Sequence, residues 1–278
     1  MARACMFCGS APITREHLWP DWLKGYLPTP PAGLAVRQGP VGAEQDRWFM
    51  KTLDQKARVV CGICNQGWMS DLEAAVAPVI GPTVADPRAP LSLSPDMRRV
   101  LARWCVKTTL VVQTALMKGR KAAYVPRDNL DWLPGHADPP PGTHVWTFLR
   151  HPVTVDGRLD YAFATAFSTA GPRPAGSDAS TSVMQPPSQP EAYVATFAIG
   201  YLGFQVFGQD RPHEGEEHRL LNVEQIAALS RILVPLWPTS DVRDLGTPRF
   251  ILGPGDIERL SRWGLPYGEG DLVPGRNI

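Results

Sequence analysis

The sequence lacks any apolar run of the roughly 18 residues that a membrane-spanning helix requires. Its first ten residues, MARACMFCGS, contain no hydrophobic segment of the kind found in secretory signals. We therefore expect a cytoplasmic protein with no membrane partner. In that reducing compartment, paired cysteines are expected to bind metal ions rather than to form disulfides.

Glycine-rich phosphate-binding loops are also missing. The segments GPGDIE and GEGDL lack the lysine of a P-loop and the third glycine of a dinucleotide-binding motif. No GxSxG motif occurs, so a serine hydrolase with a nucleophile elbow is not indicated. The sequence therefore gives no support to these common enzyme classes.

The chain has little net charge, +1 over 278 residues. This balance neither requires nor excludes a nucleic-acid partner, because a basic face can exist on a neutral protein. The length and the 44% hydrophobic fraction are sufficient for a sizeable core. The 29 prolines and 25 glycines predict long irregular connections.

Cysteine is scarce, yet four of the five cysteines form two CxxC pairs. Cys5 and Cys8 lie in CMFCGS, and Cys61 and Cys64 lie in CGICNQ. Each pair can direct two thiolates at one ion, and two pairs complete a tetrahedral site with no open position. The sequence therefore predicts a structural zinc ion. Cys105 instead falls on the apolar face of a predicted helix, where core packing is expected.

Periodicity divides the chain into two regions. Residues 1–80 contain both CxxC pairs and a predicted helix from Gln66 to about Ala77. Residues 91–278 begin with a long amphipathic helix, for which Ser94 is the expected N-cap. The two regions are expected to form an N-terminal module and a larger second part.

After this helix the period changes towards two, which predicts an antiparallel sheet. Val145–Val155 and Leu159–Thr169 are expected to form a β-hairpin, and Tyr193–Gly208 a buried strand or pair of strands. The proline- and serine-rich segment at about 170–191 is predicted to be flexible. Short helices are expected at Val223–Ile232 and Asp256–Trp263. The fold class indicated is α+β.

Glu16 and His17 lie between the two cysteine pairs, in the segment PITREHLWPDWL. A regular strand would point these side chains to opposite faces, whereas a twist or bulge could direct both at one phosphate. A carboxylate can bind a hard divalent cation, and an imidazole can take a proton from water. A carboxylate and an imidazole are together the minimum set of groups for hydrolysis of a phosphodiester.

The segment CMFCGSAPITREHLWP, followed by VVCGICNQGW, resembles the HNH family of nucleases, also called ββα-metal or His-Me finger enzymes. In that family a CxxC pair precedes an acidic residue, a histidine and, after two further residues, a proline. A second CxxC pair is followed at once by histidine or asparagine. The matching residues are Glu16, His17, Pro20, Cys61, Cys64 and Asn65. The resemblance covers about residues 1–80.

This resemblance implies an N-terminal treble-clef ββα zinc finger in which the zinc is structural. It implies that His17 activates water, while Glu16 and Asn65 bind a catalytic magnesium or manganese ion. Glu73 could add a carboxylate to that ion, or could be a solvent-facing helical residue. The family's central asparagine, which orients the histidine, has no counterpart. The nearest polar residues are Asp54, Gln55, Lys56 and Arg58.

Residues 97–127 contain eight basic residues and no acidic residue before Arg127. Three of them recur every four residues and would form a cationic stripe on the long helix. Such a stripe could bind backbone phosphates, although a solvated helix face is the alternative. The candidate nucleic-acid-binding residues are Arg15, Lys56, Arg58, Arg99, Arg103 and Lys107.

The sequence as a whole predicts an α+β protein, with an HNH-type treble-clef finger followed by a helix and an antiparallel sheet. The expected function is a metal-dependent endonuclease that hydrolyses phosphodiester bonds in nucleic acid, with DNA as the expected partner. Such an enzyme could act as a homodimer. The alternatives are a catalytically inactive zinc-finger module that binds nucleic acid or a protein, and an unrelated activity in residues 91–278.

Overall fold

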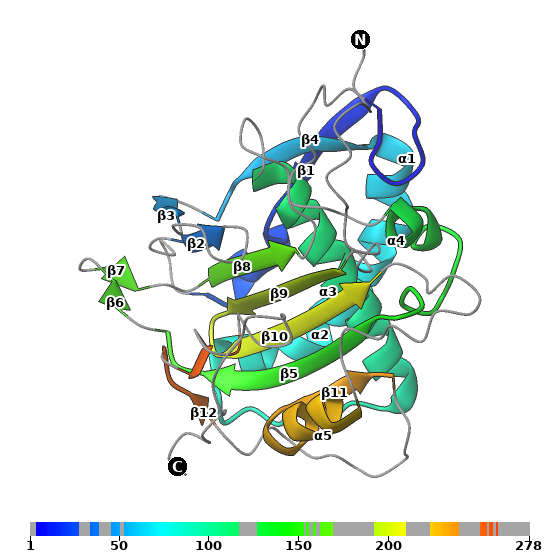
Figure 1. Cartoon of the computed structure of the whole chain (residues 1–278). Coiled ribbons are helices and arrows are strands. Elements are labelled where there is room, and N and C mark those ends of the chain that lie inside the picture. Colours follow the sequence, from blue (N-terminus) through cyan, green and yellow to red (C-terminus); the bar gives the residue numbers. More distant parts are fainter. Residues whose placement is uncertain are drawn as a thin grey trace, which may run out of the picture.

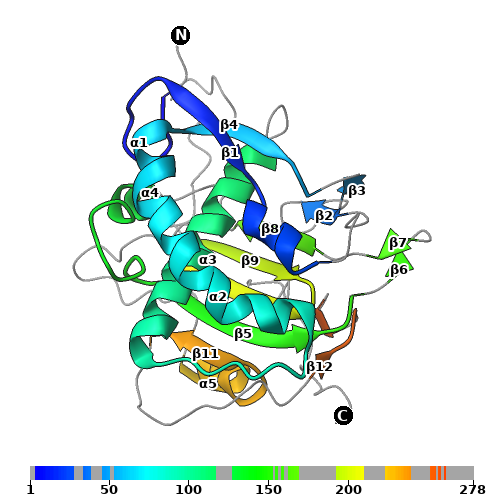
Figure 2. The same cartoon turned by 180° about the vertical axis from the view of Figure 1, so that it is seen from behind.

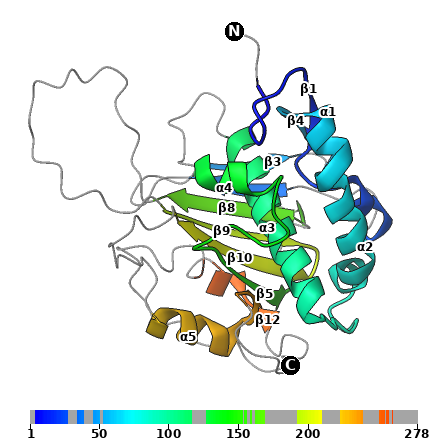
Figure 3. The same cartoon turned by 90° about the vertical axis from the view of Figure 1, so that its right-hand side faces the viewer.

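The computed structural model describes residues 4–27, 34–38, 46–50, 53–116, 127–152, 154–155, 158–159, 162–168, 192–209, 223–238, 251–254, 256–257 and 260. A large sheet has helices on both faces (Figures 1 and 2). A two-stranded hairpin of β1 (Ile13–His17) and β4 (Lys56–Cys61) lies at one end. Helices α2 (Ser70–Ala85) and α3 (Pro95–Leu116) cover one face, and α5 (Val223–Ile232) covers the other (Figure 3). The expected α+β class is confirmed.

The large sheet has eight strands. They are β2 (Leu34–Gln38), β3 (Asp46–Met50), β5 (His144–Arg150), β8 (Ala162–Ser168), β9 (Ala192–Ile199), β10 (Leu202–Gln209), β11 (Val234–Trp237) and β12 (Ile251–Leu252). Their order is β11-β5-β10-β9-β8-β2-β3, and β12 pairs with β5. Neighbouring strands are antiparallel except in the pairs β2–β8 and β12–β5, which are parallel. The sheet is therefore mainly antiparallel, as expected.

Strands β9 and β10 lie in the middle of this sheet. Every residue of both strands is buried, so Tyr193–Gly208 forms a pair of buried strands, one of the two arrangements expected. Gly200 in the connecting turn has φ +54, and a Cβ there would lie 2.0 Å from the carbonyl oxygen of Val84. Only glycine allows this turn to pack so closely against the end of α2.

The hairpin expected from residues 145–155 and 159–169 forms only at its tip, where β6 (Thr154–Val155) pairs with β7 (Arg158–Leu159). Its long arms, β5 and β8, are separated in the sheet by β10 and β9. Because β9 and β10 are buried throughout, they need neighbouring strands and packing on both sides. The prediction of a simple hairpin was wrong for this reason.

Helix α3 confirms the prediction from periodicity. Ser94 caps its start, and the side-chain Oγ accepts a hydrogen bond from the amide of Met97 (3.2 Å). Trp104 is fully buried and packs edge-to-face against Phe204 of the sheet, with ring centroids 5.8 Å apart. Cys105 is also fully buried in the core, as predicted.

Helix α2 continues beyond its predicted end near Ala77, through Pro78 and Pro82. A proline inside a helix costs about 3 kcal/mol, since it removes a hydrogen bond and crowds the preceding turn. A stripe of fully buried side chains at four-residue spacing offsets this cost by packing against the core. These side chains are Val76, Ile80 and Val84.

Residues 1–80 and 91–278 contribute to one sheet and one core. Strands β2 and β3 lie between the two CxxC pairs in the sequence, yet β2 pairs with β8 in the large sheet. One cluster of buried apolar side chains extends from Cys5 to Leu236. The division expected at residue 80 falls inside α2. Two further helices are α4 (Arg127–Trp132) and η1, a 3-10 helix (Asp21–Gly25).

Some expected features cannot be compared with the structure. The flexible segment at about 170–191 and most of the helix expected at Asp256–Trp263 lie outside the described residues. The helix expected at Val223–Ile232 is confirmed as α5. Where the chain is described, no helix is both long enough and apolar enough to span a membrane.

Candidate metal centre and catalytic face

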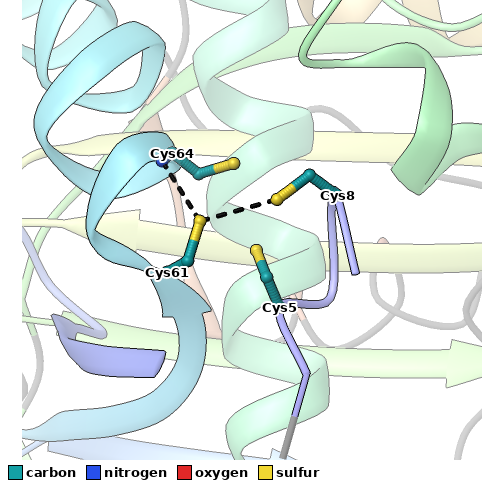
Figure 4. Close-up of side chains that lie close together, drawn as sticks. All are labelled: Cys5, Cys8, Cys61 and Cys64. Carbon is teal, nitrogen blue, oxygen red and sulfur yellow. Dashed lines mark hydrogen bonds between the residues drawn. The ribbon is translucent and has the colours of Figure 1, made fainter. Parts of the chain in front are cut away.

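The four cysteines of the two CxxC pairs converge on one point (Figure 4). Their Sγ atoms all lie within 4.8 Å of one another, and those of Cys8 and Cys61 are 3.5 Å apart. In a tetrahedral site with Zn–S bonds of about 2.3 Å, the sulfur atoms are about 3.8 Å apart. The cysteine cluster could therefore hold a metal ion such as zinc with small side-chain adjustments.

The first pair occupies a tight turn. The carbonyl oxygen of Cys5 accepts a hydrogen bond from the amide of Gly9 (2.9 Å), and Gly9 has φ +72, a conformation that favours glycine. Inside this turn, the amide of Met6 donates to the carbonyl oxygen of Val59 (2.8 Å). This bond fixes the first pair against the strand that leads to the second.

The second pair lies where β4 (Lys56–Cys61) ends and α1 (Gly62–Cys64) begins. Cys61 is the N-cap of α1, and its Sγ accepts a hydrogen bond from the amide of Cys64 (3.5 Å). The start of a helix therefore supports one of the predicted thiolate ligands.

The thiols of the cluster have different proton affinities. Burial raises the pKa of Cys5 and of Cys64, whereas hydrogen bonds with Ser10 lower the pKa of the exposed Cys8 to about 6. Metal binding requires deprotonated sulfur, and the charge of a dication compensates the burial of thiolates. A structural metal ion would therefore offset the cost of gathering three buried cysteine thiolates around one point.

The histidine and its acidic neighbour lie on the strand β1 (Ile13–His17), which pairs with β4. The register of this hairpin shifts between Thr14 and Glu16, and beyond the shift Glu16 and His17 pair regularly with β4. Glu16 is therefore buried on the inner side, whereas His17 faces outward. The bulge lies before Glu16, so it does not direct the side chains of Glu16 and His17 at one phosphate.

On the outer side of this hairpin, the imidazole of His17 lies between two carboxylates. Its Nε2 is 3.0 Å from Oδ1 of Asp54 and 3.7 Å from Oδ1 of Asp21. Lys24 is ion-paired with Asp21 and also lies 3.7 Å from Asp54, and the Nζ of Lys56 lies 3.5 Å from Asp54. The outer face therefore presents a histidine within a network of charges.

The charges of this network keep its carboxylates ionised. The hydrogen bond with His17 is the largest cause that lowers the pKa of Asp54, followed by the charges of Lys24 and Lys56. A hydrogen bond with Lys24 lowers the pKa of Asp21. Asp54 is one of the four polar residues nearest to the position of the missing asparagine. Asp21 and Lys24 were missed, because the short helix η1 that positions them has no periodic signal.

On the inner side of the hairpin, Glu16 faces a buried lysine rather than a free position for an ion. The Nζ of Lys107, whose side chain is 3% exposed, lies 2.7 Å from Oε1 of Glu73 and 4.0 Å from Oε1 of Glu16. Burial raises the pKa of Glu16 to about 7, the nearby Lys107 lowers it in part, and Glu73 raises it further. Glu73, whose side chain is 23% exposed, is therefore only partly solvent-facing, and its pairing with Lys107 leaves it unavailable to an ion.

Asn65 has a third set of partners. Its Nδ2 donates to Oγ1 of Thr14 and to the carbonyl oxygen of Arg15, both at 3.4 Å. These bonds join the helical segment after the second CxxC pair to β1. Glu16, His17 and Asn65 therefore lie on neighbouring elements, but their side chains have separate partners and do not converge on one point.

The cationic stripe predicted on α3 is engaged within the protein. Arg99 pairs with Asp96 and Asp138, and Lys107 is buried as described above. Arg103 donates from Nη2 to the carbonyl oxygen of Leu133 (2.6 Å) and lies over the ring of Trp68. The prediction of a phosphate-binding stripe is not supported here, because helix spacing does not reveal which face packs against neighbouring elements.

The other three predicted nucleic-acid contacts lie beside His17. Arg15, Lys56 and Arg58 are exposed, and alternation along β4 places Lys56 and Arg58 on the side opposite to the buried Ala57. Lys56 and Lys24 both lie near Asp54, the carboxylate that contacts His17. A polyanion could approach this face without displacing any buried group.

Glu16→Gln is expected to stabilise the protein above pH 7 by up to about 3 kcal/mol. The pKa of Glu16 is about 7 in the folded protein, against an ordinary value of 4.5. Between these values the folded state binds more protons than the unfolded state, so wild-type stability falls as the pH rises. Urea denaturation at pH 5 and pH 8 measures this fall, which should be smaller in the variant. Equal falls in the two proteins would refute the assignment.

Within the described residues, two groups of His, Cys, Asp or Glu ligand atoms converge on a point. One is the cysteine cluster, and the other consists of His17, Asp21 and Asp54. The hairpin β1–β4 carries or adjoins both groups. Comparisons of the chain with models of known protein families, with curated proteins and with solved structures found no significant match.

Proposed function

We propose that the protein is a nucleic-acid endonuclease of the HNH type, with zinc as a structural ion. The observation that carries this proposal is the contact between His17 and Asp54 on an exposed cationic face, next to the cysteine cluster. A histidine paired with a carboxylate is suited to take a proton from water. The surrounding cations suit a phosphodiester substrate.

The treble-clef assignment rests on the order of local structures. A turn carries the first cysteine pair, a two-stranded hairpin follows, and the second pair begins a helix. This is the order that the resemblance to HNH nucleases implies. In this arrangement zinc fixes the hairpin to the helix and takes no part in the reaction.

In the proposed mechanism, Asp54 accepts a hydrogen bond from Nε2–H of His17 and so leaves Nδ1 free to accept a proton. Nδ1 takes that proton from a water molecule, and the resulting hydroxide attacks phosphorus in line with the 3′ oxygen. The bond between phosphorus and the 3′ oxygen then breaks, and the departing oxygen takes a proton from solvent. Arg15, Lys56 and Arg58 neutralise the phosphate and the charge that develops on it. Asp54 acts as a positioning residue, because it touches only the histidine.

The resemblance also implies a magnesium or manganese ion bound by Glu16 and Asn65, which would stabilise the departing oxygen. The residues do not fit that ion. The carboxyl group of Glu16 is buried with a pKa near 7 and faces the ammonium of Lys107, and the amide of Asn65 is engaged with β1. We therefore derive no step through an ion held by these two residues.

The test is cleavage of supercoiled plasmid by the zinc-loaded protein, with magnesium or manganese present. His17→Ala is expected to lower the nicking rate at least about 100-fold, because general base catalysis contributes that much or more. The control is His151→Ala, which removes an exposed histidine at the end of β5. Equal nicking by wild type and His17→Ala would reject the role of His17, and no nicking by wild type would reject the nuclease.

A non-catalytic module that binds nucleic acid is the second candidate. It is favoured by one observation, that Glu16 and His17 face opposite sides of β1. In that case duplex DNA should bind without cleavage, and Arg15→Ala with Arg58→Ala should weaken binding and reduce its salt dependence. Fluorescence anisotropy over a range of salt concentrations measures both quantities.

A further inference from the structure

We propose that His17, Asp21 and Asp54 form a second metal site, which binds a zinc-type dication on the outer face of the hairpin and leaves one position open. No nuclease activity is needed for this inference, because ion binding is measured without nucleic acid. The site differs from the cysteine cluster in its ligands and its exposure. It also differs from the ion position that the family resemblance implies.

The ligand atoms already have suitable spacing. One ligand atom from each of the three residues lies within 4.8 Å of the others, with Nε2 of His17 at 3.0 Å from Asp54 and 3.7 Å from Asp21. Zinc bonds to nitrogen and oxygen are about 2.0–2.2 Å long, which places neighbouring tetrahedral ligands about 3.4 Å apart. The two observed distances lie on either side of this value, so an ion could enter after small side-chain rotations.

Buried anchors hold the three ligands in place. His17 is followed by Leu18 and Trp19, which are both buried, and the amide of Leu18 donates to the carbonyl oxygen of Gln55 (2.8 Å). This bond joins the end of β1 to the segment that carries Asp54. The ligand backbones are therefore fixed before any ion binds, which reduces the entropy lost on binding.

The same hydrophobic anchoring applies to Asp21. It opens the helix η1, whose Leu23 is fully buried, and the amide of Leu23 donates to the carbonyl oxygen of Pro20 (3.2 Å). The proline and the short helix turn the chain back, so that the carboxylate of Asp21 reaches the imidazole four residues earlier.

The lysines near the site do not prevent ion binding. The side chains of Lys24 and Lys56 are 51% and 37% exposed, so each can move into solvent when an ion replaces it. Exposed ion pairs contribute little to stability compared with a bond to a dication.

On the inner face of β1, the lysine cannot move into solvent to make room for an ion. An ion between Glu16 and Glu73 would displace the ammonium of Lys107, whose side chain is 3% exposed, from its only short carboxylate contact among the described residues. An unpaired charge in that position would be strongly destabilising. The outer face is therefore the side of the strand on which a dication can bind.

The proposed site gives His17 two alternative states. When Nε2 binds a zinc-type ion, the proton of the imidazole lies on Nδ1, and the ring cannot take a proton from water. Magnesium has little preference for imidazole and would not compete for that nitrogen. Zinc in excess of the cysteine cluster is therefore expected to suppress magnesium-supported cleavage, if cleavage is confirmed.

The experiment is isothermal titration of Zn²⁺ into protein that already contains one zinc per chain, at pH 7.5 and without nucleic acid. A second equivalent is expected to bind. Asp21→Asn and Asp54→Asn should each weaken this second binding about ten-fold or more, since each removes a charged ligand. Circular dichroism of each variant checks that the fold is kept.

Two variants serve as controls. Glu16→Gln changes the inner face of the same strand, and Asp71→Asn removes an exposed carboxylate on α2; both should leave the second binding unchanged. The proposal fails if no second equivalent binds, if Glu16→Gln weakens it, or if Asp71→Asn weakens it as much as Asp21→Asn. None of these outcomes bears on whether the protein cuts DNA.

Discussion

Cys64→Ser is expected to abolish stoichiometric zinc binding and to unfold the N-terminal hairpin together with the elements packed on it. Structural zinc in small four-ligand sites has an apparent binding free energy of about 10–16 kcal/mol, comparable with or greater than the total stability of most domains. Here the ion would join a turn, a strand and a helix start through Cys5, Cys8, Cys61 and Cys64. Removal of one thiolate leaves the buried Cys5 and Cys61 and the exposed Cys8 without that bond.

Metal analysis and thermal unfolding by circular dichroism measure this effect. Wild type should contain one zinc per chain, and an excess of chelator should lower its melting temperature as strongly as the substitution does. The matched control is Cys105→Ala, which alters a buried cysteine outside the cluster and should keep the zinc. Cys64→Ser protein that lacks zinc and melts like wild type would refute the structural role of the ion.

Lys107→Met is expected to destabilise the protein by about 3–5 kcal/mol at pH 8, the usual cost of breaking a buried ion pair. Lys107 is the cation between Glu73 and Glu16, and without it two carboxylates remain in a site largely closed to water. The loss should be smaller at pH 6, because the pKa of Glu16 is about 7 and the group then becomes protonated. Urea denaturation at the two pH values gives both numbers.

A comparable change at the surface provides the control for this prediction. Lys24→Met removes an exposed lysine that also contacts two carboxylates, and it should change the stability far less than Lys107→Met does, because solvent screens exposed ion pairs. Addition of Glu73→Gln to Lys107→Met should restore part of the stability, since it removes one uncompensated charge. If Lys107→Met and Lys24→Met have equal effects, the inner ion pair does not stabilise the fold.

The features that the sequence predicted correctly depend on short-range patterns. Two CxxC spacings predict four sulfur atoms around one point, and the structure confirms that the four cysteines cluster. Ser94 and the apolar period after it predict α3, and the dense aromatic and β-branched run predicts β9 and β10. The signals for the helix and the strands lie within the elements that they specify, and each CxxC pair spans only four residues.

The features that were predicted wrongly, or not at all, depend on contacts between distant segments. The pairing of Lys107 with Glu73 joins α3 to α2, and no helix pattern distinguishes a buried lysine from a solvated one. The order of strands places β9 and β10 between the arms of the expected hairpin. In the candidate site, the position of the β1–β4 register shift decides which side of the strand Glu16 faces. The presence of glutamate and histidine side by side in the sequence contains no information about where that shift lies.

Strand β2 has a consequence for the order in which the protein can fold. Leu34 pairs with Ala162 and Gln38 pairs with Ala166, so this strand finds its partner only after more than half of the chain has been made. Contacts between such distant residues form late, because closing a long loop is entropically unfavourable. Zinc binding by the four cysteines can precede that step and tether residues 5–64 as a loop. During synthesis, the metal would therefore keep β2 and β3 close to the position where β8 later arrives.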